Sequence, residues 1–469
     1  MKLINISGSS GVGKTTIGKI LSWLYPSSMH LCGDDLHKWE RGDLNWERFT
    51  HLNPEANNLD LGLYHITSLL SNNTITRKKY SHETGKFETG ISLDPQFPII
   101  NEGLHSLYLD EMCQLSDVNI FVDTNEELKF KWKLNRDTKK RGYTVDKVLQ
   151  TIRKRKVDED KYINPQKDKA DIILKFYEKR DGTVHLDFEL VDKKYETLAN
   201  AIITLYNKHR EFLSVCKNLS VEYDMVQAAG GNFSYKDDST MFITSSGKSF
   251  SDVSILDGFS ACSIKEVPTC TDEPCYNDFI DSLLTNKTFS RPSMETGMHM
   301  KIADTVVLHT HPIYVNTILC SREAFEVMDF ILADYDFDFV PYYTPGFELS
   351  NNFSPGANNI FLLENHGLIC SGESFSDVFY RSLKINSLCK HWLVNHSNAF
   401  TSFSGSKEKE KENGFLFPDA VVLREELSAI NSYMVSLQNE VGLTSKFLSE
   451  NEEKVLMDLE SEKYRRSLQ

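Results

Sequence analysis

The chain has 469 residues, of which 40% are hydrophobic and 25% are charged, and its formal net charge is −15. This length and composition exclude wholesale disorder and exceed one ordinary hydrophobic core, so we expect roughly two to four domains. The negative charge excludes a general nucleic-acid binder, which needs an excess of Lys and Arg to neutralise phosphates.

The sequence also bears on location. No stretch approaches about 18 consecutive apolar residues, so we expect no membrane span. The N-terminus enters an apolar, strand-like run directly, and we therefore expect no signal peptide. Nine cysteines are scattered without Cys-x-x-Cys spacing. That pattern is typical of reduced thiols, and it predicts a cytoplasmic protein.

Residues 1–205 alternate short apolar runs with amphipathic stretches. The run 3–6 leads into a glycine-rich loop and then into a helix through 17–21. Residues 98–100 and 118–122 are the next strand candidates, each bounded by turn residues. Strands that alternate with helices predict an α/β fold with a parallel, doubly wound sheet.

A phosphate-binding loop follows the first apolar run, with the sequence Gly8-Ser9-Ser10-Gly11-Val12-Gly13-Lys14-Thr15. In such a loop successive backbone N–H groups point at the phosphates, and the next helix directs its positive end at the same charge. The Lys would reach the β- and γ-phosphates of ATP, and the Thr hydroxyl would bind Mg²⁺. The predicted nucleotide-binding residues of the loop are Gly8, Gly11, Gly13, Lys14, Thr15 and Thr16.

The segments after the loop favour a kinase of small molecules over an ATPase. Residues 33–41 bring together Asp34, His37 and Arg41 just past a predicted strand end. Ligands bind at such strand ends in doubly wound sheets. Phosphoryl transfer needs a carboxylate that orients the acceptor hydroxyl or accepts its proton, with cations around the transferred group. Further polar motifs follow at residues 50–58, 80–85, 101–105 and 133–141.

These motifs, from the loop through residues 163–167, together resemble the phosphoribulokinase family, within the wider group that contains uridine kinase. The resemblance implies a P-loop kinase in which Asp34 is the catalytic base. It implies that the sugar-binding residues are His37, Arg41, Tyr80, His82 and Lys133. It also implies that Glu102 supports Mg²⁺ and that Arg136 and Arg141 close over the phosphates. A phosphorylated ketose, or a close sugar relative, is then the favoured acceptor.

The rest of the chain predicts a second unit with an appendage. A helical stretch at 195–216 bridges into residues 206–400, which are expected to form an α/β or α+β unit. Its apolar strands are expected at 241–244, 305–308 and 359–363. Residues 401–415 contain alternating Lys and Glu and are interpreted as an exposed linker. Residues 416–469 are expected to be a helical extension of the second unit.

Three histidines and one glutamate in the second unit predict a metal site. His309 and His311 end an apolar run, and residues i and i+2 of an extended segment share a face. His366 also follows an apolar strand. Three neutral imidazoles that leave one position open are typical of a catalytic Zn²⁺ site, and Glu295 precedes them in the chain.

The motifs 228–234, 243–247, 291–299, 309–312 and 364–367 resemble the class II aldolase and adducin fold, a three-layer α/β domain. The resemblance implies that His309, His311 and His366 hold Zn²⁺, which polarises a carbonyl, and that Glu295 is the acid/base. It implies that a substrate phosphate is gripped by Asn232, Ser246, Gly247 and Ser293. It also implies a homo-oligomer, with a tetramer favoured.

Two positions depart from the fuculose-phosphate type of aldolase. Met294 stands where those enzymes often carry a second serine, and the tyrosine they lend across a subunit boundary has only Tyr335, Tyr342 and Tyr343 as candidates. The leading hypothesis is a bifunctional enzyme of sugar phosphates, a kinase joined to a zinc lyase. Alternatives for the second unit are a 4-epimerase, a dehydratase, a decarboxylase or an inactive adducin-like oligomerisation module.

Overall fold

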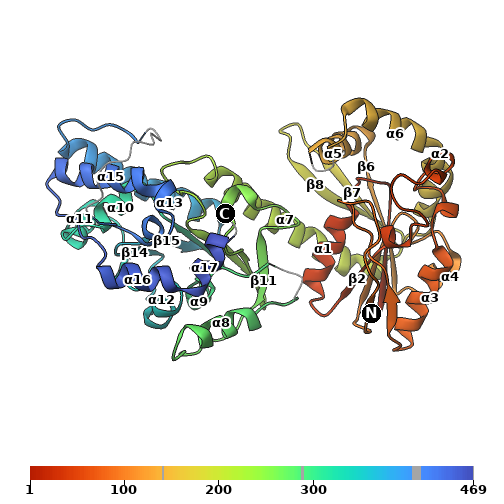
Figure 1. Ribbon diagram of the computed structural model, residues 1–469, viewed down its shortest axis with the longest axis horizontal. Helices are drawn as coiled ribbons and strands as arrows, with labels where there is room; N and C mark the ends of the chain where they lie inside the picture. Colours follow the sequence, from red (N-terminus) through yellow and green to blue (C-terminus); the bar gives the residue numbers. More distant parts are fainter. Residues whose placement is uncertain (140–141, 287–289, 404–413, 468–469) are drawn as a thin grey trace. The chain divides into compact units, whose positions relative to one another are not determined.

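The computed structural model describes residues 1–139, 142–286, 290–403 and 414–467. The chain divides into two compact units, Met1–His209 and Arg210–Gln469 (Figure 1). The division falls inside helix α7 (Glu196–Leu219), which carries the chain from the first unit into the second. The boundary expected at residues 205 and 206 lies in the same helix.

The first unit is built on a six-stranded sheet in which five strands are parallel and one edge strand is antiparallel. In spatial order the strands are β2 (Met29–Cys32), β5 (Ile99–Glu102), β1 (Leu3–Ser7), β6 (Val118–Thr124), β7 (Ile172–Glu178) and β8 (Val184–Leu190). The central strand β1 is buried along its whole length. A continuous apolar run of this kind is what a parallel strand covered on both faces requires.

Helices cover both faces of this sheet (Figure 1). On one face, Ile17, Ile20 and Leu21 form the buried stripe of α1 (Lys14–Leu24). On the other, Ile66 and Leu69 of α3 (Leu59–Leu70) pack against strands β1, β2 and β5. Further α-helices of the unit are α2 (Asn45–Arg48), α4 (Asp110–Leu115), α5 (Glu126–Lys139) and α6 (Val145–Asp158). A small hairpin of β3 (Ile75–Arg77) and β4 (Ile91–Leu93), which the sequence did not predict, lies outside the main sheet.

The second unit is built on a seven-stranded, mostly antiparallel sheet. In spatial order its strands are β11 (Phe259–Ser263), β10 (Thr240–Thr244), β9 (Asn232–Asp237), β12 (Val306–Thr310), β15 (Gly367–Gly372), β14 (Ile360–Leu363) and β13 (Asp338–Val340). Among the described strands of this second sheet, only β13 and β14 pair in parallel. The three apolar runs expected as strands are β10, β12 and β14.

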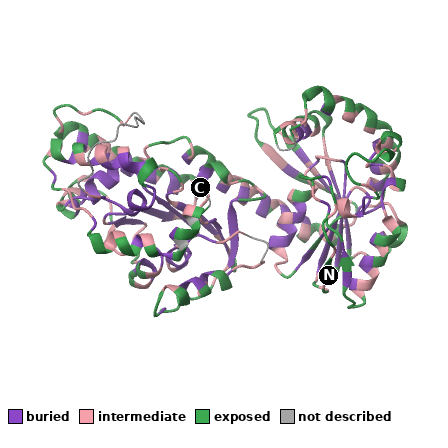
Figure 2. Ribbon diagram, in the orientation of Figure 1, coloured by how far each residue is buried: buried purple, intermediate pink, exposed green. Residues whose placement is uncertain are grey.

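Helices lie on both faces of the second sheet, which makes three layers (Figure 1). One face is covered by α8 (Glu273–Ser282), α9 (Thr296–Lys301) and α12 (Phe347–Asn352). The other carries α10 (Ile313–Leu319) and α13 (Phe375–His396), with α11 (Ala324–Ile331) beside them. Figure 2 shows that the central strands of both sheets are the most continuously buried segments. The expected α/β fold class is confirmed.

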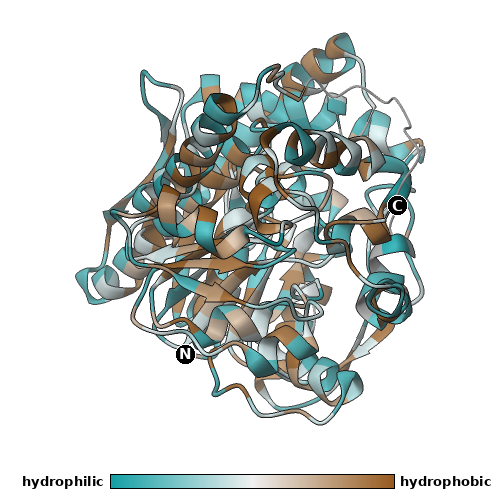
Figure 3. Ribbon diagram, turned by 90° about the vertical axis from the view of Figure 1, so that its left-hand side faces the viewer, coloured by the Kyte–Doolittle hydropathy of each residue, from teal (hydrophilic) through white to brown (hydrophobic). Residues whose placement is uncertain are grey.

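The C-terminal residues form helices that belong to the second compact unit. They are α14 (Pro418–Val422), α15 (Arg424–Val441), α16 (Glu450–Asp458) and α17 (Glu460–Ser467). Apolar and polar residues alternate along the surface helices in Figure 3, as amphipathic packing requires. Of the linker expected at 401–415, residues 404–413 lie outside the described residues.

Candidate active sites

The phosphate-binding loop connects β1 to α1 in a backbone conformation that only glycine adopts readily. Gly11 and Gly13 have φ of 88° and 98°. A Cβ on Gly13 would lie 2.6 Å from the Phe176 ring, and one on Gly8 would lie 2.3 Å from the Val122 carbonyl oxygen. The glycines are therefore required for the turn and for the close approach to the sheet.

The Lys14 ammonium group lies against the backbone of this loop. Nζ donates to the carbonyl oxygens of Gly8 at 2.9 Å and Ser9 at 2.8 Å. Burial lowers the pKa of Lys14, although the Glu102 and Asp34 carboxylates act in the opposite direction. A partly desolvated cation at the N-terminus of α1 is suited to an anionic phosphate.

Thr15 and Glu102 meet at the end of the neighbouring strand. Thr15 Oγ1 donates to Glu102 Oε1 at 2.7 Å, and His30 Nε2 lies 2.8 Å from Oε2. Burial raises the pKa of Glu102, but His30, Lys14 and Thr15 outweigh burial and leave it below its usual value. An ionised carboxylate beside a hydroxyl is the oxygen donor set that Mg²⁺ prefers. Thr16 follows in α1, half-buried.

Asp34 lies just past β2, in the short 3₁₀ turn Gly33–Leu36. Its Oδ2 is 3.0 Å from His82 Nε2, and its Oδ1 is 3.6 Å from His37 Nε2. Burial raises the pKa of the Asp34 carboxyl, but the hydrogen bond from His82 and the charges of His37 and Lys14 outweigh it and hold the pKa well below the ordinary value. The carboxylate is therefore ionised and placed as a proton acceptor.

The other predicted sugar-binding residues near Asp34 differ in how far they are buried. The buried Tyr80 ring lies edge-on to the His37 and His82 rings, at centroid distances of 5.3 and 5.4 Å. The exposed Arg41 guanidinium donates to backbone carbonyls of His82 and Glu83 and so fixes that loop. The structure thus brings the Tyr80 and His82 side chains to the base, whereas Arg41 reaches the site through the loop.

Lys133 and Arg136 come from α5, which lies over the phosphate loop. A Cβ on Gly11 would meet Lys133 Cβ at 3.5 Å and an Arg136 guanidinium nitrogen at 4.0 Å. Arg136 Nε is 2.9 Å from Asp137 Oδ1, and Lys133 Nζ is 3.8 Å from Oδ2 of the same carboxylate. Arg141 lies outside the described residues.

A pair that the sequence analysis missed anchors the Asp34 turn. Asp35 accepts from Arg77 Nε at 3.2 Å and from the Tyr80 backbone N–H at 2.8 Å. The buried Arg77 also donates to the Cys32 carbonyl. These bonds join the Asp34 turn to the hairpin of β3 and β4. Asp35 and Arg77 are 42 residues apart, so no local sequence motif links them.

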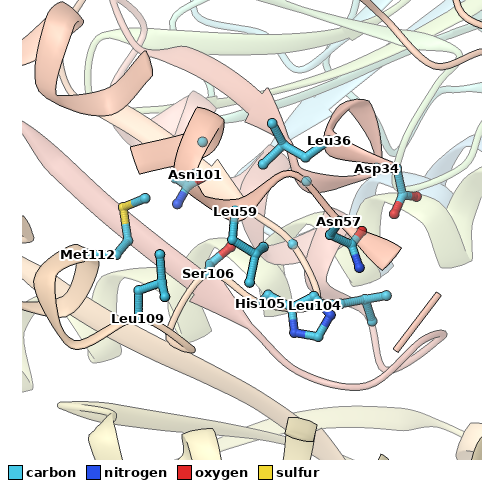
Figure 4. Close-up of a pocket in the computed structure, with 13 residues that line it drawn as sticks. Asp34, Leu36, Asn57, Leu59, Asn101, Leu104, His105, Ser106, Leu109 and Met112 are labelled. Carbon is cyan, nitrogen blue, oxygen red and sulfur yellow. The ribbon is translucent and has the colours of Figure 1, made fainter. Parts of the chain in front are cut away.

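A cavity opens beside Asp34 (Figure 4). Its wall is largely apolar, but Asn57 and His105 add polar groups. Asn57 Oδ1 lies 2.9 Å from His37 Nδ1 and so orients that ring. Burial lowers the pKa of His105 to about 4, so its imidazole is neutral at neutral pH. Asp34 is thus one of the residues that line the cavity.

The three predicted metal ligands converge in the second unit. His309 lies in β12, His311 just after it, and His366 in the turn between β14 and β15. All three are buried, and their candidate ligand nitrogens lie within 4.8 Å of one another. Strand pairing explains the convergence, because β12 and β15 are antiparallel neighbours and the turn before β15 therefore lies beside the end of β12.

The hydrogen bonds of these rings fit a bound cation. His309 Nδ1 lies 3.2 Å from the Leu368 carbonyl oxygen, which only accepts, and His311 Nδ1 lies 2.7 Å from Asp419 Oδ2. Both Nδ1 atoms therefore carry the proton in the neutral ring, and the two Nε2 atoms, 2.9 Å apart, present lone pairs to each other. Two facing lone pairs repel unless a cation lies between them.

The protonation states of His309 and His366 also suit metal binding. Burial lowers the pKa of His309 well below its usual value, and His311 acts in the same direction. Burial lowers the pKa of His366 to about 3, against the opposing Glu295 charge. Neutral imidazole is the metal-binding form, so the residues fit a divalent metal ion.

Glu295 faces the trio. Its Oε1 is 3.3 Å from His366 Nε2 and its Oε2 is 3.5 Å from His309 Nε2. Asn232 Nδ2 donates to Oε2 at 2.6 Å, and the Asn232 amide is oriented by His299, which in turn bonds Ser234 Oγ at 2.7 Å. The sequence analysis missed His299, whose only local signal is its place four residues after Glu295.

A cavity opens over this cluster. The predicted phosphate contacts Asn232, Ser246, Gly247 and Ser293 all line it, as do Met294, Glu295, His311 and His366. Two further lining carboxylates, Asp419 and Glu462, come from the C-terminal extension and were not predicted as site residues. The three candidate tyrosines are absent from the described residues that line this cavity.

Comparison with protein families matches two segments. Residues 3–182 match the phosphoribulokinase/uridine kinase family, and residues 210–393 match the class II aldolase and adducin N-terminal domain. In the described part of the chain, no helix has the length and apolar character needed to cross a membrane.

Individual relatives match the first segment. A phosphoribulokinase of Synechocystis sp. is 37% identical over 174 residues, which cover 37% of this chain and 52% of the relative. A uridine kinase of Listeria innocua is 31% identical over 203 residues, which cover 42% of this chain and 95% of the relative. The chain thus spans about half the length of the phosphoribulokinases that it matches.

Two solved structures are also similar. The N-terminal class II aldolase domain of a conserved protein from Thermoplasma acidophilum is 20% identical, with a TM-score of 0.36 over 39% of this chain and 92% of that one. Phosphoribulokinase from Rhodobacter spheroides is 24% identical, with a TM-score of 0.35 over 42% of this chain and 84% of that one.

Proposed function

Since the chain belongs to the phosphoribulokinase/uridine kinase family through residues 3–182 and to the class II aldolase/adducin family through residues 210–393, we propose that it is a bifunctional enzyme of sugar phosphates. The first unit transfers a phosphoryl group from ATP, and the second cleaves or forms a carbon–carbon bond in a phosphorylated ketose. The observation that carries this proposal is that each unit has its own cavity lined by a candidate proton acceptor, Asp34 in the first unit and Glu295 in the second.

In the first unit Asp34 accepts the proton of a sugar or sugar-phosphate hydroxyl as that oxygen attacks the γ-phosphorus and ADP leaves. His37 and His82 keep the carboxylate ionised and oriented. Lys14 and Arg136 offset the negative charge of the transferred group. Thr15 and Glu102 hold Mg²⁺, which neutralises phosphate charge.

In the second unit His309, His311 and His366 hold Zn²⁺, which supplies polarisation of a substrate carbonyl. Glu295 takes up and returns the proton that moves as the bond between the α-carbon and the carbinol carbon breaks. Asn232 orients Glu295, and Ser246, Gly247 and Ser293 are the donors proposed to grip the phosphate. The proposal includes a homo-oligomer, a tetramer by analogy, and a cytoplasmic location, which suits the nine free thiols.

The test is a screen for ADP release with ATP and a panel of pentoses, ketoses and their phosphates, followed by mass analysis of the products. We expect ADP with at least one acceptor and two smaller carbonyl products. No ADP with any acceptor would contradict the kinase half. A product of unchanged mass would instead identify an epimerase, loss of water a dehydratase and loss of CO₂ a decarboxylase.

The order of the two reactions is tested with Glu295→Gln, which keeps the size of the side chain and removes its charge. We expect this variant to accumulate a phosphorylated sugar that the intact protein consumes. Glu266→Gln, an exposed position of the same unit, is the matched control and should behave as the intact protein. If no such sugar accumulates, the sequential pathway is wrong.

Zinc content distinguishes the enzyme from a binding protein. Elemental analysis of the purified protein should give one Zn²⁺ per chain. A clearly sub-stoichiometric content, together with no turnover, would favour the adducin-like oligomerisation module.

A further inference from the structure

The segment 414–446, which we call the C-terminal clamp, begins beyond the matched aldolase domain, which ends at residue 393. It contains α14 and α15. Its residues contact the segments that carry His311 and His366, although it is distant from both in the sequence.

The first contact is made by Asp419 of α14. This side chain is 5% exposed, and its Oδ2 lies 2.7 Å from His311 Nδ1. A Cβ on Gly230 would lie 2.5 Å from the same oxygen and 2.8 Å from His311 Nδ1, so the glycine leaves room for the pair. A carboxylate on the far nitrogen of a metal-binding imidazole fixes the ring and its tautomer and makes the near nitrogen a stronger donor.

The second contact holds the turn that carries His366. Asn365 has a left-handed backbone with φ of 52°, and its Nδ2 donates to the carbonyls of Leu416 at 2.7 Å and Lys446 at 2.6 Å. Glu364, the preceding residue, pairs with Lys446 Nζ at 2.5 Å. Two adjacent residues before the ligand are thus bonded to the clamp.

The third contact reaches the helix that follows His311. Gln438 of α15 is fully buried and donates to the carbonyls of Thr317 at 2.7 Å and Cys320 at 3.0 Å, at the end of α10. Asn431 of α15 accepts from the Leu416 N–H at 2.9 Å and donates to the Gly414 carbonyl at 2.9 Å. The clamp is therefore tied together internally as well as to the ligand-bearing segments.

We propose that the C-terminal clamp is a working part of the metal centre, in which Asp419 is a positioning residue for His311 and Asn365 holds the His366 turn in place. The inference rests on the proposed metal in the second unit. It adds that the affinity for the metal depends on residues outside the aldolase domain. Removal of either contact lets a ligand ring rotate or shift, and the metal then binds more weakly.

The experiment uses the full-length chain and measures the Zn²⁺ dissociation constant at one fixed pH by competition with a chromophoric chelator. Asp419→Asn keeps the shape and an acceptor oxygen but loses the charge, and Asp419→Ala loses both. We expect the dissociation constant to rise about 10-fold to 100-fold, with Ala above Asn. Glu453→Gln, which removes a surface partner of Arg424 in the same extension, is the matched control and should bind as the intact protein.

Asn365→Gly tests the second contact independently. Glycine adopts the left-handed backbone without strain, so this change removes the two side-chain bonds alone. We expect a similar rise in the dissociation constant. The absorption bands of the Co²⁺-loaded protein should also shift in the Asp419 variants, because those bands report ligand geometry and a purely structural role would leave them unchanged.

The outcomes are separable. If the intact protein binds no Zn²⁺, the proposed lyase function fails. If it binds Zn²⁺ and the Asp419 variants bind equally tightly with unchanged Co²⁺ bands, the inference is overturned. For a variant of reduced stability, the rise in unfolding temperature on adding Zn²⁺ is compared with that of the intact protein, and an equal rise also overturns it.

Discussion

Ionisation at single residues decides what each cavity can do. Asp34 stays ionised because two imidazoles and Lys14 outweigh its burial, so it can accept a proton. His309 and His366 stay neutral because burial outweighs their partners, so they can bind a metal. Burial acts on both kinds of group, and the neighbouring charges determine the result.

A first prediction concerns Asp34→Asn. The amide cannot accept the hydroxyl proton, so we expect kcat of ADP release to fall about 10²-fold to 10⁴-fold, with ATP binding unchanged. Asp43→Asn is the matched control, because Asp43 is exposed in the same segment and its Oδ1 accepts from the backbone N–H and the side-chain amide of Asn45, away from Asp34. Equal loss in both variants would mean that the segment, rather than the base, had been damaged.

At the scale of elements, close approaches between strands set the geometry of the histidine cluster proposed to bind a metal. A Cβ on Gly367, at the start of β15, would lie 2.5 Å from the Thr310 carbonyl oxygen and 2.9 Å from both the His309 and His311 rings. A Cβ on Gly372, at the other end of the strand, would meet a Val378 methyl group at 3.3 Å. The two ends of β15 therefore differ in how well they accommodate an added methyl group.

This difference gives a second prediction. Gly367→Ala should push the two ligand rings apart and raise the Zn²⁺ dissociation constant at least about tenfold, since overpacking costs about 1–3 kcal/mol and 1.4 kcal/mol is a factor of ten. Gly372→Ala should leave Zn²⁺ binding unchanged. Chelator competition measures both, and similar values for the two variants would contradict the argument.

A third prediction concerns helix α7 and the pH dependence of stability. Burial lowers the pKa of His209 to about 3, with Lys19 acting in the same direction, and the ring lies 4.6 Å from the Trp23 ring. The folded chain keeps this imidazole neutral, whereas the unfolded chain protonates it below about pH 6.5. Stability is therefore lost as pH falls from 6.5 towards 3, by about 3 kcal/mol from this group at pH 4.

His209→Phe should remove that part of the loss. The measurement is the free energy of unfolding in urea at pH 7 and pH 4, followed by tryptophan fluorescence, since four of the five tryptophans lie in the first unit. The variant should lose less stability between the two pH values than the intact protein. Equal losses would show that His209 is already protonated in the folded chain.

At the scale of the whole molecule, each unit has its own sheet, core and cavity. We therefore expect two unfolding transitions, each stabilised by its own ligand. Mg²⁺-ATP should stabilise only the first unit, whose unfolding tryptophan fluorescence reports most strongly, and Zn²⁺ should stabilise only the second. Each ligand should raise the free energy of unfolding of its unit by about 2.7 kcal/mol at a concentration 100 times the dissociation constant. Calorimetry checks this prediction, and one transition that both ligands raise would contradict it.

Local patterns in the sequence determined much of this protein. The glycine-rich loop, the apolar runs that became β1, β10, β12 and β14, and the pair His309 and His311 are all defined by spacings of a few residues. Such spacings are set by strand and helix periodicity, which the chain carries without reference to distant parts. The three candidate metal ligands and both predicted folds followed from these patterns and from the family resemblance.

Tertiary structure alone decided which residues contact these candidate site residues. Strand order sets His309 of β12 beside Asn232 of β9 on one side and Ile369 of β15 on the other. Asp419 reaches His311 across 108 positions of sequence, and Arg77 reaches Asp35 across 42. No periodicity links residues so far apart, because their contact depends on how the sheet and the C-terminal helices pack. The chain's spacings thus specified the candidate reactive groups, and the packing of the fold specified which residues orient them.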